Sequence, residues 1–320
     1  MAMIQVDNLV KHFPVRGGIL NRVVANVHAL NGVSFEIERG ETVGIVGESG
    51  CGKSTLGKTL VRLIEATSGT IRYQSEEITH MSHSELMPLR REMQFIFQDP
   101  YSALNPRMTA GGMLREVIRF HKVVPADQVE SYIDSLLGKV GMSADAKKKF
   151  PHEFSGGQRQ RLNIARALAV KPEFIVADEP VSALDVSIQA QILNLLMDLK
   201  EEFSLTLLFI SHDLKVIEHF CDRMLVMYLG HVVEELPCDD ILEKARHPYT
   251  QALLKSNPVS DPDERRELVL LEGDVPSPRN PPSGCPFVTR CPIAETRCSA
   301  EMPTLKQKDE GYRVSCWAVE

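Results

Sequence analysis

Residues 47–55 read GESGCGKST, and this stretch decides the fold because of the two segments that it joins. The segment before it, residues 42–46 (TVGIV), is an apolar run typical of a buried strand. The segment after it, residues 56–64, has the pattern of a helix. A strand, a glycine-rich loop and a helix in this order predict a nucleotide-binding unit.

The residue types in this loop suit contact with phosphate groups. Gly47, Gly50 and Gly52 permit a positive φ and a close approach of the backbone to an anion. Lys53 brings a positive charge to the β and γ phosphates, and Ser54 can ligate Mg²⁺. The helix N-terminus that follows adds unpaired amides, which attract anions. An ordinary strand-to-helix turn does not explain why glycine, lysine and serine all stand in these places.

Length and charge limit the classes of protein to which the chain can belong. Its 320 residues can bury a full core, as one large domain or as a domain with an appendage. The net charge of −7 argues against nucleic-acid binding by bulk electrostatics, so we expect no nucleic-acid partner. The basic runs at 90–91 and 147–149 are interpreted as solvated faces.

The ends and the apolar runs of the sequence bear on its location. The N-terminus, MAMIQVDNLV, lacks the features of a signal peptide, and no apolar run reaches the ~18 residues of a membrane-spanning helix. We therefore expect a cytosolic chain. In that compartment, seven cysteines are expected to be thiols or metal ligands rather than structural disulfides.

Strand-like and helix-like segments alternate along much of the chain, which predicts a mostly parallel sheet covered on both faces. The predicted strands are residues 3–10, 29–37, 41–46, 70–73, 93–97, 174–177, 205–210, 223–228 and 231–235, with a hairpin-like turn at Gly230. Residues 11–27 are interpreted as a loop. The predicted helices are residues 157–170 and 186–203, with shorter ones at 238–244 and 249–255.

A different pattern occupies residues 109–140, where apolar residues recur at helical spacing. One stripe comprises Met113, Leu114, Val117 and Ile118, and the next comprises Val129, Ile133, Leu136 and Leu137. These stripes predict a helical subdomain inserted into the α/β body.

Two carboxylates end the predicted strand at residues 174–177. Asp178 is expected to hold Mg²⁺, directly or through water, and Glu179 to polarise an attacking water molecule. An Asp-Glu pair after a strand can also be structural, since Asp caps helices. Together with Lys53, the catalytic interpretation is favoured.

A second anion-binding helix end is predicted by Ser155, Gly156, Gly157 and Gln158, which open a helix rich in arginine. One nucleotide hardly needs two such ends. With both, the sequence resembles the ABC ATPases, in which the phosphate loop of one subunit faces this signature on a second subunit, with ATP buried between them. The family motif usually begins with Leu, and we expect Phe154 at that place to change packing only.

The resemblance implies roles for further residues. The whole loop would bind nucleotide, including Glu48, Ser49, Cys51 and Thr55, and Phe13 would stack on adenine. Gln98 corresponds to the family's glutamine loop and would join Ser54 and Asp178 around Mg²⁺. Asp185 closes the loop after the catalytic acid, and His212 would sense the γ-phosphate. Lys53, Gln98, Glu179 and His212 form the expected catalytic set.

The resemblance also implies the architecture. It is an α/β, ABC-type P-loop ATPase with a mostly parallel core sheet, an antiparallel β subdomain and a helical subdomain at about residues 100–170. The nucleotide-binding domain would occupy residues 1–240, and a C-terminal extension residues 241–320. Two bound ATP molecules would close a dimer, and hydrolysis would release it.

The C-terminal part resembles the ATPase subunits of dipeptide and oligopeptide importers. The residues that carry this resemblance are HPYT at 247–250, PPSGCP at 281–286 and RCP at 290–292. The segment DERR at 263–266 suggests one of the two paralogous ATPases that such importers pair as a heterodimer.

Cys285, Cys291, Cys298 and Cys316 all lie in this extension, with 5, 6 and 17 residues between them. Zinc sites favour a tighter pair of ligands, and four loosely spaced cysteines suit a [4Fe-4S] cluster, as the resemblance implies. Zinc and unligated thiols remain alternatives. The cluster would be structural, because a small segment without a core needs a cross-link.

The resemblance implies two membrane permease subunits, a paralogous ATPase and an extracytoplasmic peptide-binding protein as partners, at the cytoplasmic face of the cell membrane. Uptake of nickel, another metal chelate or an antimicrobial peptide is an alternative. A soluble ABC ATPase acting on ribosomes or DNA is a further one, although those proteins typically carry tandem ATPase halves or a coiled coil. A lone P-loop kinase or GTPase would lack the signature motif.

Overall fold

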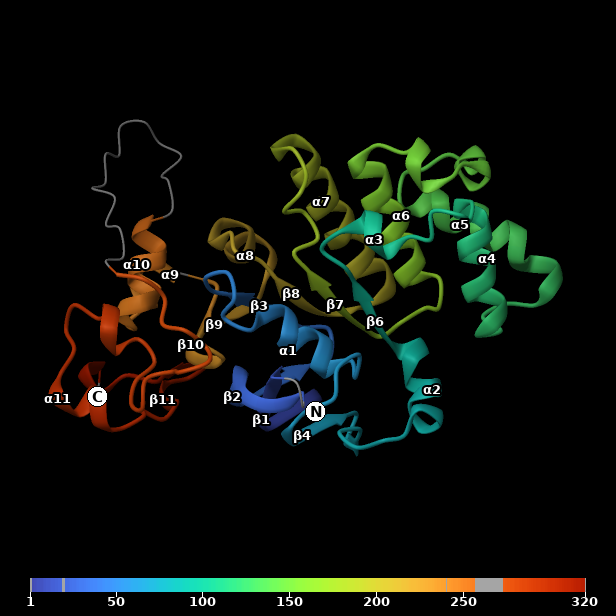
Figure 1. Cartoon of the computed structure of the whole chain (residues 1–320). Helices are drawn as coiled ribbons and strands as arrows, with labels where there is room; N and C mark the ends of the chain where they lie inside the picture. The colour runs from blue at the N-terminus through green and yellow to red at the C-terminus, as the bar shows by residue number, and fades with distance from the viewer. Residues whose placement is uncertain (1, 19–20, 240, 257–272, 320) are drawn as a thin grey trace. The chain divides into compact units, whose positions relative to one another are not determined.

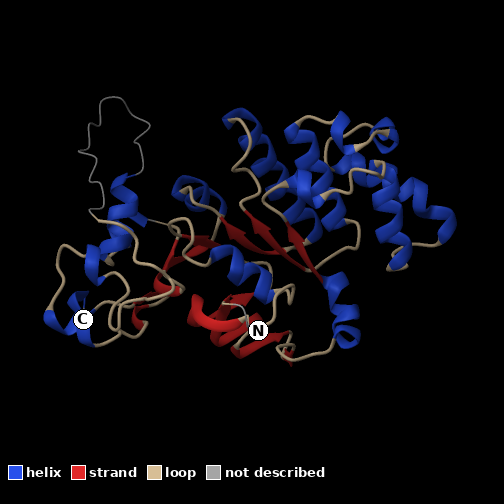
Figure 2. Cartoon of the chain, in the orientation of Figure 1, coloured by secondary structure: helices blue, strands red, loops and turns tan. Residues whose placement is uncertain are grey.

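The computed structural model describes residues 2–18, 21–239, 241–256 and 273–319, and the DERR segment at 263–266 lies outside them. The chain divides into two compact units. The first comprises residues 1–37, 42–80 and 211–320, and the second comprises residues 38–41 and 81–210. Figures 1 and 2 show the elements of both.

The first unit contains an antiparallel sheet with the strand order β2-β1-β4-β5. Its strands are β1 (Ala2–Gly17), β2 (Arg22–Glu38), β4 (Ser68–Tyr73) and β5 (Glu76–Glu77). The expectation of a loop at 11–27 is wrong for most of that range, because β1 and β2 extend far into it. Those residues are mainly exposed or half-buried, so the backbone ladder forms them without the apolar alternation that marks a buried strand.

The same unit contributes five neighbouring strands, in the order β11-β12-β10-β9-β3, to a second sheet. They are β3 (Thr42–Val46), β9 (Arg223–Tyr228), β10 (His231–Pro237), β11 (Lys306–Asp309) and β12 (Tyr312–Val314). β3 and β9 are parallel, and the other pairs are antiparallel. The predicted turn joins β9 to β10 through Leu229 and Gly230, both at positive φ, as a tight hairpin requires.

The helices of the first unit are short. They are α1 (Lys53–Leu60), α8 (Leu214–Phe220), α9 (Ile241–Lys244), α10 (Pro248–Ser256) and α11 (Thr296–Ala300). Helix α1 begins three residues before the expected start at 56, because its first turn, Lys53-Ser54-Thr55, carries no apolar pattern.

The second unit contains three parallel strands in the order β8-β7-β6, all nearly fully buried. These strands are β6 (Met93–Ile96), β7 (Phe174–Asp178) and β8 (Thr206–Ile210). Helix α7 (Val186–Phe203) has the predicted bounds. Helix α2 (His83–Glu92) was not predicted, although Ser82 and Glu85 form the capping box that marks its start.

Residues 97–173 of the second unit, all of which the structure describes, contain helix and loop but no strand (Figure 2). Their α-helices are α3 (Pro100–Ala103), α4 (Ala110–Phe120), α5 (Val129–Lys139) and α6 (Gly156–Leu168). Both predicted stripes are confirmed: Ile118 and Ile133 are fully buried, as are most of their stripe partners.

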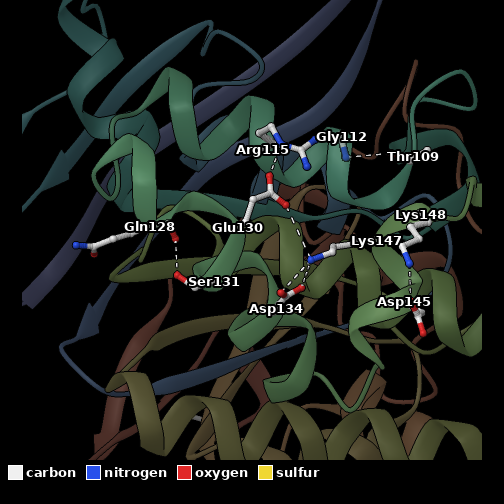
Figure 3. Close-up of polar contacts among 10 residues, drawn as sticks. All are labelled: Thr109, Gly112, Arg115, Gln128, Glu130, Ser131, Asp134, Asp145, Lys147 and Lys148. Atoms are coloured by element: carbon white, nitrogen blue, oxygen red, sulfur yellow. Dashed lines mark hydrogen bonds and ion pairs between the residues drawn. The ribbon is translucent and has the colours of Figure 1, made fainter.

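Ion pairs link neighbouring elements of this helical region (Figure 3). Arg115 of α4 donates to Glu130 of α5 at 2.6 Å, and Lys147 donates to Asp134 of α5, also at 2.6 Å. Lys147 thus crosses from the basic run to α5. Exposed pairs of this kind contribute little individually, so they orient the helices more than they stabilise them.

The C-terminal extension joins the sheet of the first unit around a buried carboxylate. Glu234 of β10 is fully buried, and its Oε1 accepts three hydrogen bonds. The donors are the backbone N–H of Arg246 at 2.7 Å, that of His247 at 2.9 Å and the hydroxyl of Tyr312 at 2.6 Å. One acceptor therefore ties β10, the start of α10 and β12 together.

Replacing Glu234 by alanine should destabilise the protein by about 3 kcal/mol, because three donors, two of them in buried hydrogen bonds, lose their acceptor. Glu234→Gln keeps an oxygen in the same place and should lose about 1 kcal/mol or less. Calorimetric melting of the full chain checks this. Equal melting temperatures for the two variants would show that the extension is held by other contacts.

Candidate functional site

The phosphate loop is built around two glycines whose α-carbons lie against backbone carbonyls. A Cβ on Gly47 would lie 2.2 Å from the carbonyl oxygen of Met227, and a Cβ on Gly52 would lie 2.3 Å from that of Ala29. Both glycines also have positive φ, +150° and +109°. No side chain fits at either position, so the loop has its shape because these two residues are glycine.

The β9–β10 turn supports the loop from one side. The N–H of Gly230 donates to the carbonyl of Cys51 at 2.8 Å, and Asn31 of β2 donates from its own N–H to the carbonyl of Gly230 at 2.9 Å. Burial raises the pKa of Cys51, which therefore stays a neutral thiol at pH 7. The loop thus forms part of the sheet framework, as a rigid binding site requires.

Lys53 points back into its own loop. Its side chain is buried, and Nζ donates to the carbonyls of Gly47 at 2.6 Å and Glu48 at 3.1 Å. A buried ammonium is a suitable partner for phosphate oxygens. The structure therefore brings the predicted lysine together with the first residues of its loop.

His212 borders a cavity beside this loop. The cavity has a volume of about 240 Å³, and its lining comprises Val46, Gly47, Glu48, His212, Leu214, Leu253 and Ser256. The N–H of Ser211 donates to the carbonyl of Ile45 at 3.1 Å, so the segment that carries His212 is fixed to β3. His212 thus shares this cavity with Gly47 and Glu48, at the start of the phosphate loop. Leu253 and Ser256 of α10 were not expected there.

In the second unit, the predicted acids lie at the carboxyl edge of the parallel strands. Ile96 of β6 is in register with Ala177 of β7, which brings the residues after both strands together. Gln98 Nε2 consequently donates to Glu179 Oε2 at 2.9 Å. Glu179 has a φ of +44°, an uncommon value for a residue with a side chain, and its N–H donates to the carbonyl of Ile210 at 3.0 Å.

This hydrogen bond determines which atoms of Gln98 and Glu179 face each other. The NH₂ group of Gln98 holds the carboxylate of Glu179, so the amide oxygen of Gln98 remains the atom that can ligate a cation. Asp178 is buried at the end of β7. Carboxylate, amide and hydroxyl oxygens are the hard ligands that Mg²⁺ prefers, so Asp178, Gln98 and Ser54 suit it chemically.

The second anion-binding end forms the N-terminus of α6. Ser155 Oγ accepts the N–H of Gln158 at 3.3 Å, and Gln158 Oε1 accepts the N–H of Ser155 at 3.1 Å, a complete capping box. A Cβ on Gly157 would lie 2.7 Å from Ile188 of α7, so glycine allows the two helices to approach closely. Phe154 is buried, in keeping with a packing role.

The arginines of α6 serve the fold. Arg159 donates to the carbonyl of Pro151 at 2.8 Å, Arg161 to that of Val140 at 2.8 Å, and Arg166 to that of Ala103 at 2.6 Å. They therefore fasten the surrounding loops to the helix. Asp185 is exposed at the N-cap of α7, and the following Val186 is 82% exposed. Phe13 is half-buried on β1, with Lys11 Nζ 4.8 Å from its ring centre.

The four cysteines of the extension line one small cavity, together with His247, Phe287 and Trp317. The N–H of Cys285 donates to the carbonyl of Cys298 at 2.7 Å, which brings two of their segments side by side. Across the described ranges, no three His, Cys, Asp or Glu side chains are placed as ligands of a single metal ion. The four cysteines thus share a cavity, but they do not form the ligand sphere of a single metal ion.

Two residues at the phosphate loop were missed by the sequence analysis. Arg290 donates to both carboxylate oxygens of Glu48, and the Tyr249 hydroxyl accepts the N–H of Glu48 at 2.8 Å. Both come from the C-terminal extension. The HPYT motif flagged Tyr249 as a family feature, but no local pattern connects position 249 or 290 to position 48.

Comparison with known proteins gives two family matches, ABC transporter over residues 30–182 and oligopeptide/dipeptide transporter C-terminal region over residues 233–298. A probable peptide ABC transporter ATP-binding protein, y4tS of Sinorhizobium fredii, is 52% identical over 98% of this chain and 89% of its own length. The oligopeptide transport ATP-binding protein AppF of Bacillus subtilis is 47% identical over 98% of this chain and 96% of its own.

A solved structure of an ATP-binding cassette is also similar to this chain. It is the dimeric structure of a post-hydrolysis state of the ATP-binding cassette MJ0796 bound to ADP and Pi, which is 29% identical. The match covers 74% of this chain and 99% of that chain, with a TM-score of 0.65. The predicted fold class is thereby confirmed.

Substituting alanine at Gly47 should prevent the loop from forming, with a loss of about 3 kcal/mol or more, because the new Cβ meets the Met227 carbonyl. Gly50 is a matched control. Its φ is +81°, but a Cβ there has no neighbour within 4 Å, so Gly50→Ala should lose only about 1 kcal/mol. Melting temperatures of both variants measure the difference, and equal losses would contradict the proposed steric cause.

Proposed function

This chain belongs to the ABC transporter family, and on that basis we propose that it powers an importer of dipeptides or oligopeptides by hydrolysing ATP. The observation that carries the proposal is the joint match, in one chain, to the ABC transporter family and to the oligopeptide/dipeptide transporter C-terminal region. Relatives that match almost its full length are named for peptide transport. Their names favour peptides over the nickel, metal-chelate and antimicrobial-peptide alternatives, and over action on ribosomes or DNA.

In this proposal the phosphate loop binds the triphosphate of ATP. Residues 47–55 wrap the phosphates with backbone amides, and Lys53 turns from its loop carbonyls to the β and γ phosphates. Ser54, Gln98 and Asp178 would hold Mg²⁺, which neutralises the charge that develops on the phosphate oxygens. His212, at the edge of the adjoining cavity, would contact the γ-phosphate.

Glu179 acts as the general base in this scheme. The hydrogen bond from Gln98 holds this carboxylate at the end of β7, where it would orient a water molecule and accept its proton. Because phosphoryl transfer needs little covalent help, positioning of this kind supplies much of the rate.

The α6 N-terminus would serve the nucleotide of a second ATPase. Residues 155–158 present a helix end to an anion, and Asp185 and Val186 are exposed beside it, as a subunit contact requires. The MJ0796 cassette is dimeric with ADP and Pi. Here the partner would be the paralogous ATPase of the same importer. Phe13 would stack on adenine.

Membrane partners complete the proposal. No helix in the described part of this chain is long and apolar enough to cross a membrane. Two permease subunits would form the channel, an extracytoplasmic binding protein would deliver the peptide, and this chain would attach peripherally at the cytoplasmic face.

For the extension, we propose that Cys285, Cys291, Cys298 and Cys316 hold a [4Fe-4S] cluster. Their convergence on one cavity supports this, and each cysteine of such a cluster binds a different iron, so a geometry unsuited to a single ion is compatible with it. Burial raises the pKa of Cys285 to about 11, so binding would have to displace protons.

Glu179→Gln should leave ATP binding intact and lower turnover by at least about 10²-fold, because the amide cannot accept the proton. We expect peptide uptake by the importer, reconstituted in liposomes with its permeases and binding protein, to stop as well. Glu201→Gln, an exposed glutamate on α7, is the control and should behave as wild type. Undiminished phosphate release by Glu179→Gln would show that Glu179 is not the general base. Transport of metal chelates but not of peptides by the wild-type importer would contradict the proposed substrate class.

The full chain, purified without oxygen, should be brown and contain about four irons per molecule, with a visible absorption band. Cys298→Ser should lose the iron and the colour. Cys238→Ser is the matched control, since Cys238 is buried in the same unit but does not line the cavity. Zinc without iron, or a colourless protein with four free thiols, would each overturn the cluster.

A further inference from the structure

The phosphate loop contains a residue whose charge opposes its task. Glu48 is the second residue of a loop that must bind a triphosphate, and like charges at close range repel. The carboxylate therefore has to be neutralised or directed away from the anion. In the structure, Arg290 is the residue that pairs with this carboxylate.

Arg290 forms a bidentate ion pair with Glu48. NH1 donates to Oε2 at 2.6 Å and NH2 donates to Oε1 at 3.1 Å. The Arg290 side chain is 5% exposed and that of Glu48 is 27% exposed, so water screens this pair only partly. The hydrogen bonds that Arg290 donates to Glu48 raise the pKa of its guanidinium above the ordinary value. A two-pronged, largely buried pair is among the stronger ionic contacts that a protein makes.

A second contact from the extension fixes the backbone at the same residue. The Tyr249 hydroxyl accepts the N–H of Glu48 at 2.8 Å, and Tyr249 is fully buried. Burial lowers the pKa of His247 to about 3, so its neutral ring can accept the N–H of Tyr249 at Nδ1, 3.1 Å away. Tyr249 is thus held at both its backbone and its hydroxyl.

The aromatic rings around these contacts make them rigid. Tyr228 of β9 packs against Tyr249 with 4.7 Å between ring centres, and Phe287 packs against both, at 5.3 and 5.4 Å. Phe287 and Arg290 lie in the stretch between Cys285 and Cys291. The conformation of that stretch therefore sets where the Arg290 guanidinium meets the phosphate loop.

We propose that Arg290 and Tyr249 are positioning residues of the nucleotide site, through which the C-terminal extension sets the affinity of the phosphate loop for ATP. Arg290 cancels the charge of Glu48, and Tyr249 holds the first peptide of the loop in place. The proposal rests on the proposed function, because it requires that this loop binds ATP. Beyond that function, it gives the extension a direct role in nucleotide binding.

Binding of MgATP to the full chain in the Glu179→Gln background tests this without turnover. Arg290→Met should raise the dissociation constant about tenfold, because Glu48 is then left unpaired beside the phosphates. Adding Glu48→Gln to Arg290→Met should recover most of that loss, which a purely structural role of Arg290 would not allow. Tyr249→Phe keeps the ring and should weaken binding about threefold. In the active enzyme these variants should raise KM more than they lower kcat.

Arg297→Met is the matched control. Arg297 lies in the same extension and pairs with Glu301 at 3.0 Å, with both side chains about half exposed. It should bind MgATP as the parent does. Failure of the parent protein to bind MgATP would count against the proposed function itself. Wild-type affinity in Arg290→Met and Tyr249→Phe, or no recovery on adding Glu48→Gln, would overturn this inference while leaving that function standing.

Discussion

The close approach of two backbone carbonyls to the phosphate loop is the constraint on which the first unit depends. The Met227 carbonyl meets Gly47 and the Ala29 carbonyl meets Gly52, at distances that leave no room for a Cβ. These contacts bind strands β9 and β2 to the loop that follows β3. The turn that we propose as the phosphate site is thereby made part of a sheet, which holds its backbone in place. Such preorganisation is what an anion site needs to act without rearranging.

In the second unit, the register of the parallel strands brings the predicted catalytic residues together. Parallel strands β6, β7 and β8 end at a common edge, so Gln98 and Glu179 meet although 81 residues separate them. The positive φ of Glu179 is stored strain at this edge, and the hydrogen bond from its N–H to Ile210 helps to maintain it. In the same unit, the capping box of Ser155 and Gln158 shapes the N-terminus of α6, the helix end that we propose for a second nucleotide.

The extension is attached by polar contacts as much as by apolar ones. The carboxylate of Glu234 accepts three hydrogen bonds within the first unit. At the phosphate loop, Glu48 accepts hydrogen bonds from Arg290 and donates its N–H to the Tyr249 hydroxyl. Breaking these buried hydrogen bonds would leave donors without an acceptor, so the contacts favour one arrangement of the extension. A segment that looks like a loosely attached appendage in sequence thus contacts the phosphate loop directly.

The sequence by itself determined the elements and the chemistry wherever the signal was local. The glycine loop, the acids after a buried strand, the stripes of α4 and α5, and the bounds of α7 all follow from spacing along a few turns or one strand. The exposed parts of β1 and β2 were missed, because they lack the apolar alternation of a buried strand and are formed by backbone pairing between these two strands. Only the tertiary structure could decide that Arg290 and Tyr249 meet Glu48, or that the four cysteines share a cavity. Those contacts join residues up to 242 positions apart, and no periodicity or motif encodes such a distance.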